Sequence, residues 1–212
     1  MTNRYGDIDA RIDKILPAIP GWCTPEKGKR IAHLARDVNP RLCVELGVFG
    51  GRSLVALAMG MAMNGAGRVH GVDPFTKSAA MEGTNDKAND VWWSKINYDD
   101  VRRHALRAVE VNGLQPFVTF VRERSQDVVD RYEDGSIDIL HQDSNHSAEV
   151  STGEVRTWMP KLRLGGFWIF DDIDWETTRN AQQLLLDSGF QCLEKFEKWA
   201  IFQSVGAVLK GR

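Results

Sequence analysis

The sequence predicts an α/β fold: a mostly parallel sheet of seven strands, with helices on both faces and an antiparallel hairpin at the C-terminal edge. From residue 42 onward, short runs rich in β-branched and aromatic residues alternate with helical patterns, as is typical of parallel strands joined by crossover helices. At 189–196 and 198–202, by contrast, two such runs follow each other directly. Because no crossover helix fits between them, we expect these two strands to be antiparallel.

The chain begins with two expected helices between residues 7 and 37, separated by the proline-containing connector 17–25. Thr24 is the expected N-cap of the second helix, because a proline at the first helical position and a glutamate in the first turn follow it. We interpret residues 1–24 as an N-terminal helical cap and residues 25–212 as the main domain.

Hydrophobic periodicity places the elements of the main domain. Parallel strands are expected at 42–46, 68–73, 117–121, 137–142 and 167–171. Helices are expected at 52–63, 98–112, 126–132, 148–159 and 176–188. The connection 75–98 is too long for a simple turn and contains Trp92 and Trp93, so we predict that it forms a lid. The alternative is a surface excursion whose tryptophans pack back on the domain.

Composition limits the possible classes of protein. A chain of 212 residues with 42% hydrophobic residues can form one α/β domain with a proper core. A net charge of −2 gives no sign of the basic field of a nucleic-acid binder. Three widely spaced cysteines suggest neither a disulfide framework nor a thiolate zinc site, and no apolar run approaches the ~20 residues that span a bilayer. We therefore expect a cytoplasmic protein that contacts neither nucleic acid nor membrane.

A glycine-rich turn follows the first expected strand. Residues 45–53 read Glu-Leu-Gly-Val-Phe-Gly-Gly-Arg-Ser and lead into an apolar helical run, which indicates a strand, a tight turn and a helix. Glycines let the backbone approach a ligand, and the helix N-terminus offers unpaired N–H groups. Asp73 ends the next strand, where a carboxylate can accept hydrogen bonds from both hydroxyls of a ribose. Together these features predict a site for a nucleoside-containing cofactor.

The details of the turn indicate which cofactor it is. The spacing departs from the Gly-x-Gly-x-x-Gly of dinucleotide sites, and Glu45 would repel a pyrophosphate but suits the cationic groups of S-adenosylmethionine. With this turn and Asp73, the chain resembles the class I S-adenosylmethionine-dependent methyltransferases, which have a Rossmann-like fold. The resemblance implies a set of cofactor-binding residues: Glu45, Gly47, Gly51, Ser53, Asp73, Ser125, Gln126 and Asp143. Ser125 is equally well explained as the N-cap of the helix that follows it.

Acidic residues end the fourth and fifth strands. Asp143 follows the fourth strand, and Asp171 and Asp172 follow the fifth. In an open parallel sheet the carboxyl ends of the strands meet at one edge, so these carboxylates are expected to converge. Three carboxylates close together need a compensating cation, and oxygen ligands favour magnesium, calcium or manganese. A divalent metal such as Mg²⁺ is the simplest prediction.

The same residues carry a closer resemblance. Metal-dependent catechol-type and sugar O-methyltransferases have aspartates at these positions, and methyltransferase domain family 24 is nearer still. That family has a Gly-Trp-Cys-x-x-Glu-Lys opening, matched by 21–27, an Asp-x-x-His segment, matched by 143–146, and a Gly-Gly-(x)4-Asp-Asp ending, matched by 165–172. Where the family usually has Asp-Gly before the histidine, this chain has Asp143-Ser144-Asn145.

The resemblance implies methyl transfer from S-adenosylmethionine to a hydroxyl of a small molecule, by analogy a sugar or another polyhydroxylated compound. Asp143, through a bound metal, and His146, through its imidazole, are the two candidates for removing the hydroxyl proton. His146 could instead be an N-terminal residue of the 148–159 helix with no chemical role, and the Asp171-Asp172 pair could cap the helix near 175. A nucleotide-dependent oxidoreductase and a non-catalytic cofactor-binding module are the alternative functions. The oligomeric state stays open, with a homo-oligomer as one option.

Overall fold

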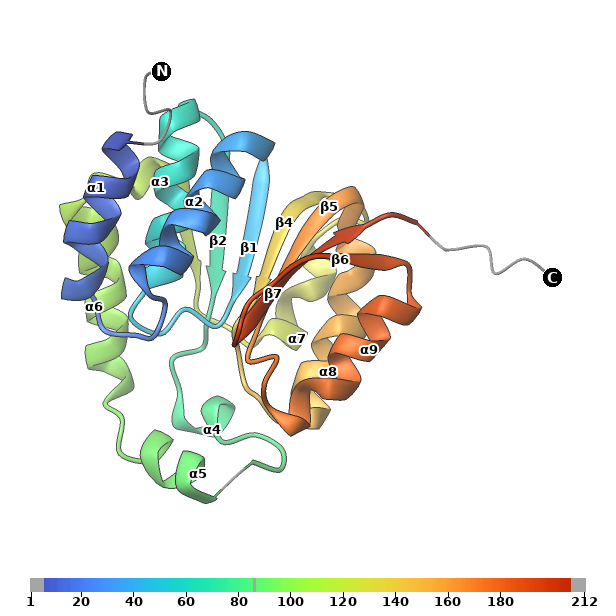
Figure 1. Cartoon of the computed structure of the whole chain (residues 1–212). Helices are drawn as coiled ribbons and strands as arrows, with labels where there is room; N and C mark the ends of the chain where they lie inside the picture. The colour runs from blue at the N-terminus through green and yellow to red at the C-terminus, as the bar shows by residue number, and fades with distance from the viewer. Residues whose placement is uncertain (1–5, 86, 207–212) are drawn as a thin grey trace.

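The computed structural model describes residues 6–85 and 87–206; residues 1–5, 86 and 207–212, which include the start of the expected cap, lie outside this range. Figure 1 shows a central sheet of seven strands in the order β3-β2-β1-β4-β5-β7-β6. The strands are β1 (Leu42–Leu46), β2 (Arg68–Val72), β3 (Val118–Val121), β4 (Ile137–Gln142), β5 (Leu162–Asp171), β6 (Phe190–Lys195) and β7 (Trp199–Ser204).

Strand pairing confirms the predicted topology. Strands β1 to β5 are paired in parallel, whereas β7 is antiparallel to both of its neighbours, β5 and β6. The start of the fifth strand was predicted wrongly, because β5 begins at Leu162 rather than at 167. Two adjacent glycines are typical of a turn, but Gly165 and Gly166 lie within β5. The register of the β4–β5 pairing shifts opposite them, between Ile137 and Ile139.

Helices cover both faces of the sheet, as predicted (Figure 1). They are α1 (Gly6–Ile15), α2 (Pro25–Val38), α3 (Arg52–Asn64), α4 (Lys77–Ala80), α5 (Lys87–Trp93), α6 (Tyr98–Val111), α7 (Ser125–Val128), α8 (Ala148–Trp158) and α9 (Arg179–Asp187). The expected helices at 126–132 and 176–188 are each divided into a short α-helix and a 3-10 turn. None of the described helices has the length and apolar composition to cross a membrane.

Two hydrophobic cores lie on opposite sides of the sheet. One is formed with α1, α2, α3 and α6 and includes Ile12 and Leu54; the other is formed with α7, α8 and α9 and includes Trp158 and Leu185. Trp158 and Trp168 are fully buried in the second of these cores. These cores fix the sheet and leave its carboxyl edge to carry a site.

The N-terminus of α2 is fixed as the sequence predicts. The Thr24 hydroxyl accepts a hydrogen bond from the backbone N–H of Lys27 at 3.2 Å, and Pro25 is the first helical residue. Helix α2 packs closely on α3 because Gly60 has no side chain: a Cβ there would lie 2.8 Å from Ala35 Cβ. This packing directs the first turn of α2 toward the end of β5.

The connection between β2 and α6 lies beyond the carboxyl ends of the strands and contains α4 and α5 (Figure 1). The side-chain amide of Asn145, in the loop after β4, donates to the carbonyls of Ala79 and Ala80 at 3.0 Å each. The connection is therefore fastened to the loop that carries Asp143 and His146. Its role as a lid, and the division of the chain at residue 24, stay predictions.

Candidate active site

A cavity of about 1120 Å³ opens at the carboxyl edge of the sheet. It is lined by residues that follow β1, β2, β4 and β5, by the N-terminal connector and by the connection between β2 and α6. Most of the predicted site residues line it: Gly47, Asp73, Ser125, Gln126, Asp143, His146, Asp171 and Asp172. Glu45, Gly51 and Ser53 are not among the lining residues. The structure thus brings residues from distant parts of the chain to one place.

The glycine turn is pressed against the loop after β4. Gly47 has a φ of +84°, in the left-handed region that favours glycine. A Cβ on Gly47 would lie 2.6 Å from the carbonyl carbon of Asp143 and 2.7 Å from Ser144 Cα, and closer still to the Asp143 carbonyl oxygen. Gly51, with a φ of +91°, precedes the first residue of α3. The glycines therefore serve both the tight turn and its close approach to Asp143.

Glu45 and Ser53 are buried on either side of the glycine turn in the sequence and are hydrogen-bonded to each other. The Ser53 hydroxyl donates to Glu45 Oε1 at 2.7 Å. The other carboxylate oxygen, Oε2, lies 3.6 Å from His141 Nδ1. Glu45 thus lies beneath the cavity and contacts the histidine of the neighbouring strand.

Asp73 links the end of β2 to the glycine turn. Its Oδ2 accepts hydrogen bonds from the backbone N–H groups of Val48 at 2.9 Å and Phe49 at 3.1 Å, and its Oδ1 accepts one from Phe75 at 2.7 Å. Burial raises the pKa of Asp73 above its ordinary value, and these three hydrogen bonds oppose that effect. Because a carboxylate has about four lone-pair sites, Asp73 retains capacity to accept from a ligand.

Ser125 and Gln126 line the cavity, and Ser125 does not cap a helix. The N-cap of α7 is Arg124, so the alternative explanation of Ser125 was wrong. Its hydroxyl instead donates at 2.6 Å to Glu154, which also accepts from Ser144 at 2.5 Å. Burial raises the pKa of Glu154 above its ordinary value, although its hydrogen bonds oppose the shift.

Sequence analysis did not single out Glu154. It lies within α8, where a glutamate is usually solvated, yet it is only 4% exposed. A signal was present, because Glu154 continues the stripe of Ser151, Val155 and Trp158 that α8 buries.

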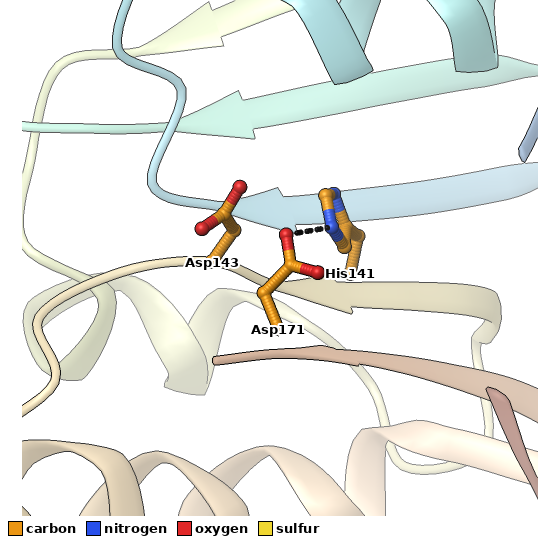
Figure 2. Close-up of side chains that lie close together, drawn as sticks. All are labelled: His141, Asp143 and Asp171. Carbon is orange, nitrogen blue, oxygen red and sulfur yellow. Dashed lines mark hydrogen bonds and ion pairs between the residues drawn. The ribbon is translucent and has the colours of Figure 1, made fainter. Parts of the chain in front are cut away.

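Four side chains form what we call the inner group: Lys27, His141, Asp143 and Asp171. His141 Nε2 lies 3.1 Å from Asp171 Oδ2, and the same oxygen forms an ion pair with the ammonium of Lys27. Figure 2 shows His141, Asp143 and Asp171 close together at the ends of neighbouring strands. Lys27, His141 and Asp171 are buried, Asp143 is partly buried, and His141 has no exposed surface.

The charged side chains of the inner group shift one another's pKa values. Burial and the neighbouring charge of Asp171 raise the pKa of Asp143 well above its ordinary value. Burial alone would also raise the pKa of Asp171, but Lys27 and His141 hold it below its ordinary value. Burial would lower the pKa of Lys27, yet Asp171 and Asp143 raise it above the ordinary value. Asp171 and Lys27 are therefore both charged.

The outer group comprises Asp143, His146 and Asp172. His146 Nε2 lies 2.7 Å from Asp172 Oδ2, and its ring packs against Trp175 with the centroids 4.5 Å apart. Asp172 has a φ of +56°, so the chain turns sharply after Asp171 and the two aspartates reach different partners. Neither aspartate side chain caps the following 3-10 turn, which has Trp175 as its N-cap.

Among the residues that the structure describes, two sets of side chains are close enough to hold a metal ion. Within each set the ligand atoms lie within 4.8 Å of one another: His141, Asp143 and Asp171 form one, and Asp143, His146 and Asp172 the other. Asp143 belongs to both, whereas Asp171 and Asp172 belong to different sets. The predicted three-aspartate arrangement is thus divided between two places.

Aromatic side chains gather at the mouth of the cavity. Trp22, Phe49, Trp92 and Trp93, here called the aromatic cluster, all line it, and their ring centroids are 4.8 to 6.2 Å apart. Trp22 remains 63% exposed and Trp92 42% exposed. Exposed apolar side chains that adjoin one another often mark a binding surface. Trp175 also lines the cavity, beside His146.

Comparison with known proteins identifies the family. A family model described as a methyltransferase domain, family 24, matches residues 44–173, which is more than half of the chain. No curated protein matches the chain significantly in sequence.

Solved structures share the fold over nearly the whole chain. The O-methyltransferase NovP has a TM-score of 0.73 and 14% identity, covering 94% of this chain and 99% of NovP. An O-methyltransferase from Bacillus cereus, solved with S-adenosylhomocysteine, has a TM-score of 0.62 and 16% identity, covering 93% and 90%. The O-methyltransferase TomG from Streptomyces achromogenes, solved with S-adenosylmethionine, has a TM-score of 0.62 and 14% identity, covering 97% and 92%.

The family match covers the glycine turn, Asp73, the Asp143–His146 segment and the Asp171-Asp172 pair. It confirms the resemblance drawn from those residues: the chain belongs to methyltransferase domain family 24 and is a class I S-adenosylmethionine-dependent methyltransferase.

Proposed function

We propose that this enzyme transfers the methyl group of S-adenosylmethionine to a hydroxyl oxygen of a small molecule, with His146 as the general base. The observation that carries the proposal is the His146–Asp172 pair, 2.7 Å apart, at the cavity edge next to Asp143. The similarity to NovP, TomG and the Bacillus cereus enzyme, all named as O-methyltransferases, supports oxygen as the acceptor atom.

The cofactor fits against the glycine turn. Its ribose would lie at Asp73, its adenine at Ser125 and Gln126, and its amino-acid portion at Gly47 and Asp143, all of which line the cavity. Glu45, Gly51 and Ser53 would support this binding indirectly, by shaping the turn. Methyl transfer is a direct displacement, so these contacts contribute by aligning the methyl group with the acceptor oxygen.

The base must accept the acceptor's proton. Because a carboxylate only accepts hydrogen bonds, the pairing with Asp172 places a proton on Nε2 of His146 and leaves Nδ1 as the basic atom. Nδ1 is buried and has no hydrogen-bond partner among residues 6–85 and 87–206. A buried polar atom without a partner is uncommon in proteins, and a small movement of the His146 ring, which lines the cavity, would give Nδ1 the acceptor hydroxyl as its partner. Asp172 would stabilise the imidazolium that forms.

Metal assistance by Asp143, Asp171 and Asp172 is the other route to the same reaction. A divalent metal there would chelate acceptor hydroxyls and lower the pKa of one of them. The side-chain pairings favour histidine assistance, because Asp171 already has the ammonium of Lys27 as its cation and Asp172 pairs with His146.

The aromatic cluster suggests how the acceptor is held. Tryptophan and phenylalanine rings pack against flat apolar faces, including those of sugar rings, and the carboxylates deeper in the cavity accept from hydroxyls. We therefore propose a compact, polyhydroxylated ring compound as the acceptor and no nucleic-acid partner. We further propose that the enzyme acts in the cytoplasm, where the free thiols of Cys23, Cys43 and Cys192 stay reduced. A homo-oligomer is compatible with this activity.

Two variants test the base. His146→Ala should lower kcat by ~10² or more while leaving the affinity for S-adenosylhomocysteine intact, because general-base catalysis typically contributes 10²–10⁴. His104→Ala is the matched control, since His104 is an exposed residue of α6 outside the cavity lining. A panel of sugars and polyhydroxylated aromatics with labelled S-adenosylmethionine gives the turnover. Full activity of His146→Ala would remove this residue from the mechanism, and failure to bind S-adenosylhomocysteine would overturn the placement of the cofactor.

A further inference from the structure

We infer that Lys27 is the built-in cation of the inner group, so that methyl transfer by this enzyme requires no divalent metal at Asp143 and Asp171. The activity part of this inference rests on the proposed function. The metal-binding part does not depend on the proposed function, because it concerns only whether these side chains can bind a metal ion.

The inner group does not fit a metal ion. Lys27 Nζ is paired with Asp171 Oδ2, the oxygen that also faces His141 Nε2, so an ammonium already occupies one of the two carboxylate oxygens that Asp171 could offer a metal. A divalent cation bound between Asp143 and Asp171 would have to lie beside this ammonium, and like charges at such short range repel strongly in a partly dry cavity. A cation that belongs to the chain therefore already balances the charge of Asp171.

Lys27 is held in place from several directions. Its backbone N–H is bonded to the Thr24 cap at the start of α2, and its ammonium lies 5.5 Å from the ring centroid of Trp199 on β7. The Lys27 side chain is only 10% exposed, and that of Asp171 8%. A buried ammonium without Asp171 would be costly, and so would Asp171 without the ammonium. A metal ion would therefore have to displace a side chain that these contacts hold in place.

The ion pair also extends into the sheet. Asp171 on β5 connects Lys27 to His141 on β4, and His141 Nδ1 lies 3.6 Å from Glu45 on β1. The chain of contacts therefore spans three neighbouring strands, β1, β4 and β5, and Figure 2 shows its link between His141 and Asp171. Lys27 acts as a positioning residue, since it fixes Asp171 and, through it, His141 beneath the cofactor site.

The test uses three variants of the full chain. Lys27→Met keeps most of the side-chain volume but removes the charge, and Lys27→Arg keeps the charge. Lys29→Met is the matched control, because Lys29 lies on the same helix but pairs with Asp13 outside the cavity lining. Mn²⁺ binding is measured by electron paramagnetic resonance without acceptor, and turnover is measured before and after treatment with EDTA.

We expect EDTA-treated wild-type enzyme to keep its full turnover. Lys27→Met should bind Mn²⁺ about tenfold more tightly than wild type or more, because it removes the ammonium that repels a metal ion from two carboxylates and a histidine. Lys27→Arg and Lys29→Met should bind it no better than wild type. Loss of turnover in EDTA with recovery in Mg²⁺, or equal Mn²⁺ affinity of Lys27→Met and wild type, would overturn the inference.

Two further measurements separate misfolding of a variant, and failure of the proposed function, from failure of this inference. Where Lys27→Met fails to fold, as its thermal melt would show, EDTA treatment of the wild-type enzyme decides alone. Calorimetry with S-adenosylhomocysteine tests the proposed function separately: absence of binding would refute the cofactor site, while the Mn²⁺ titrations would still decide whether Lys27 excludes a metal.

Discussion

Replacement of Gly47 by alanine should destabilise the protein and disrupt the cofactor site together. Two costs add at this position. The φ of +84° is unfavourable for a residue with a Cβ by about 1–2 kcal/mol, and the added atom would lie within 2.7 Å of the Asp143 carbonyl carbon and Ser144 Cα. Because backbone atoms cannot rotate away, relieving the overlap should cost about 1–3 kcal/mol more. We therefore expect a total loss of about 2–5 kcal/mol.

The loss should be visible as a lower melting temperature. For a chain of this length each kcal/mol corresponds to roughly 2–4 °C, so Gly47→Ala should melt roughly 4–20 °C below wild type. The assay is differential scanning calorimetry, repeated with S-adenosylhomocysteine at about 100 times its dissociation constant. Wild type should gain about 2.7 kcal/mol from the ligand. The variant should gain much less, because relief of the overlap moves Asp143 away from the turn.

Gly65→Ala is the matched control. Gly65 has a φ of +66° at the other end of α3, but nothing lies within 4 Å of an added Cβ. Gly65→Ala should lower the free energy of unfolding only by the conformational cost of about 1–2 kcal/mol. S-adenosylhomocysteine should stabilise it as much as it stabilises wild type. If Gly47→Ala proved as stable as Gly65→Ala and bound the ligand equally well, the close approach of the turn to Asp143 would not matter for the site.

Two further predictions concern stability and the acceptor. Burial would raise the pKa of Asp138, but Arg163 Nε at 2.5 Å and two backbone N–H groups lower it below its ordinary value of 3.8. The ionised Asp138 side chain therefore stabilises the folded state above pH 3.8, and this contribution is lost as the pH falls through the lowered pKa of the folded state. Asp138→Asn should therefore melt below wild type at pH 7, and the difference should shrink in acid; a pH-independent difference in a series of thermal melts would contradict this. Trp22→Ala should raise the KM for the acceptor several-fold with little change in melting temperature, since Trp22 is 63% exposed. Leu164→Ala, at an exposed position outside the cavity lining, is its control in steady-state kinetics, and an unchanged KM in Trp22→Ala would exclude the aromatic cluster from acceptor binding.

Local patterns were sufficient for most of the fold. The alternation of strand and helix signals, and the absence of a crossover between the last two strands, predicted the sheet and its antiparallel edge. The error at β5 arose where Gly165 and Gly166 have the composition of a turn, because only pairing with β4 keeps such residues within a strand.

The site could be predicted less completely. Asp143, His146 and Asp172 were found because they follow strands, and strand ends meet at one edge of a parallel sheet. Lys27 was part of a recognised motif but received no role, and Glu154 received no attention. Their partners are remote: Lys27 lies 144 residues from Asp171, and Glu154 lies 29 residues from Ser125. Sequence spacing carries no information about contacts of this kind.

The sequence by itself determined the class of fold, the glycine turn, the cofactor family and the set of acids at the cavity edge, because each depends on a short pattern or on the order of the elements. Only the tertiary structure decided how those acids are paired. The left-handed turn at Asp172 separates it from Asp171, so that one aspartate meets Lys27 from α2 and the other meets His146 from the loop after β4. Such pairings depend on how distant elements pack, and burial then decides which charges must be balanced within the protein.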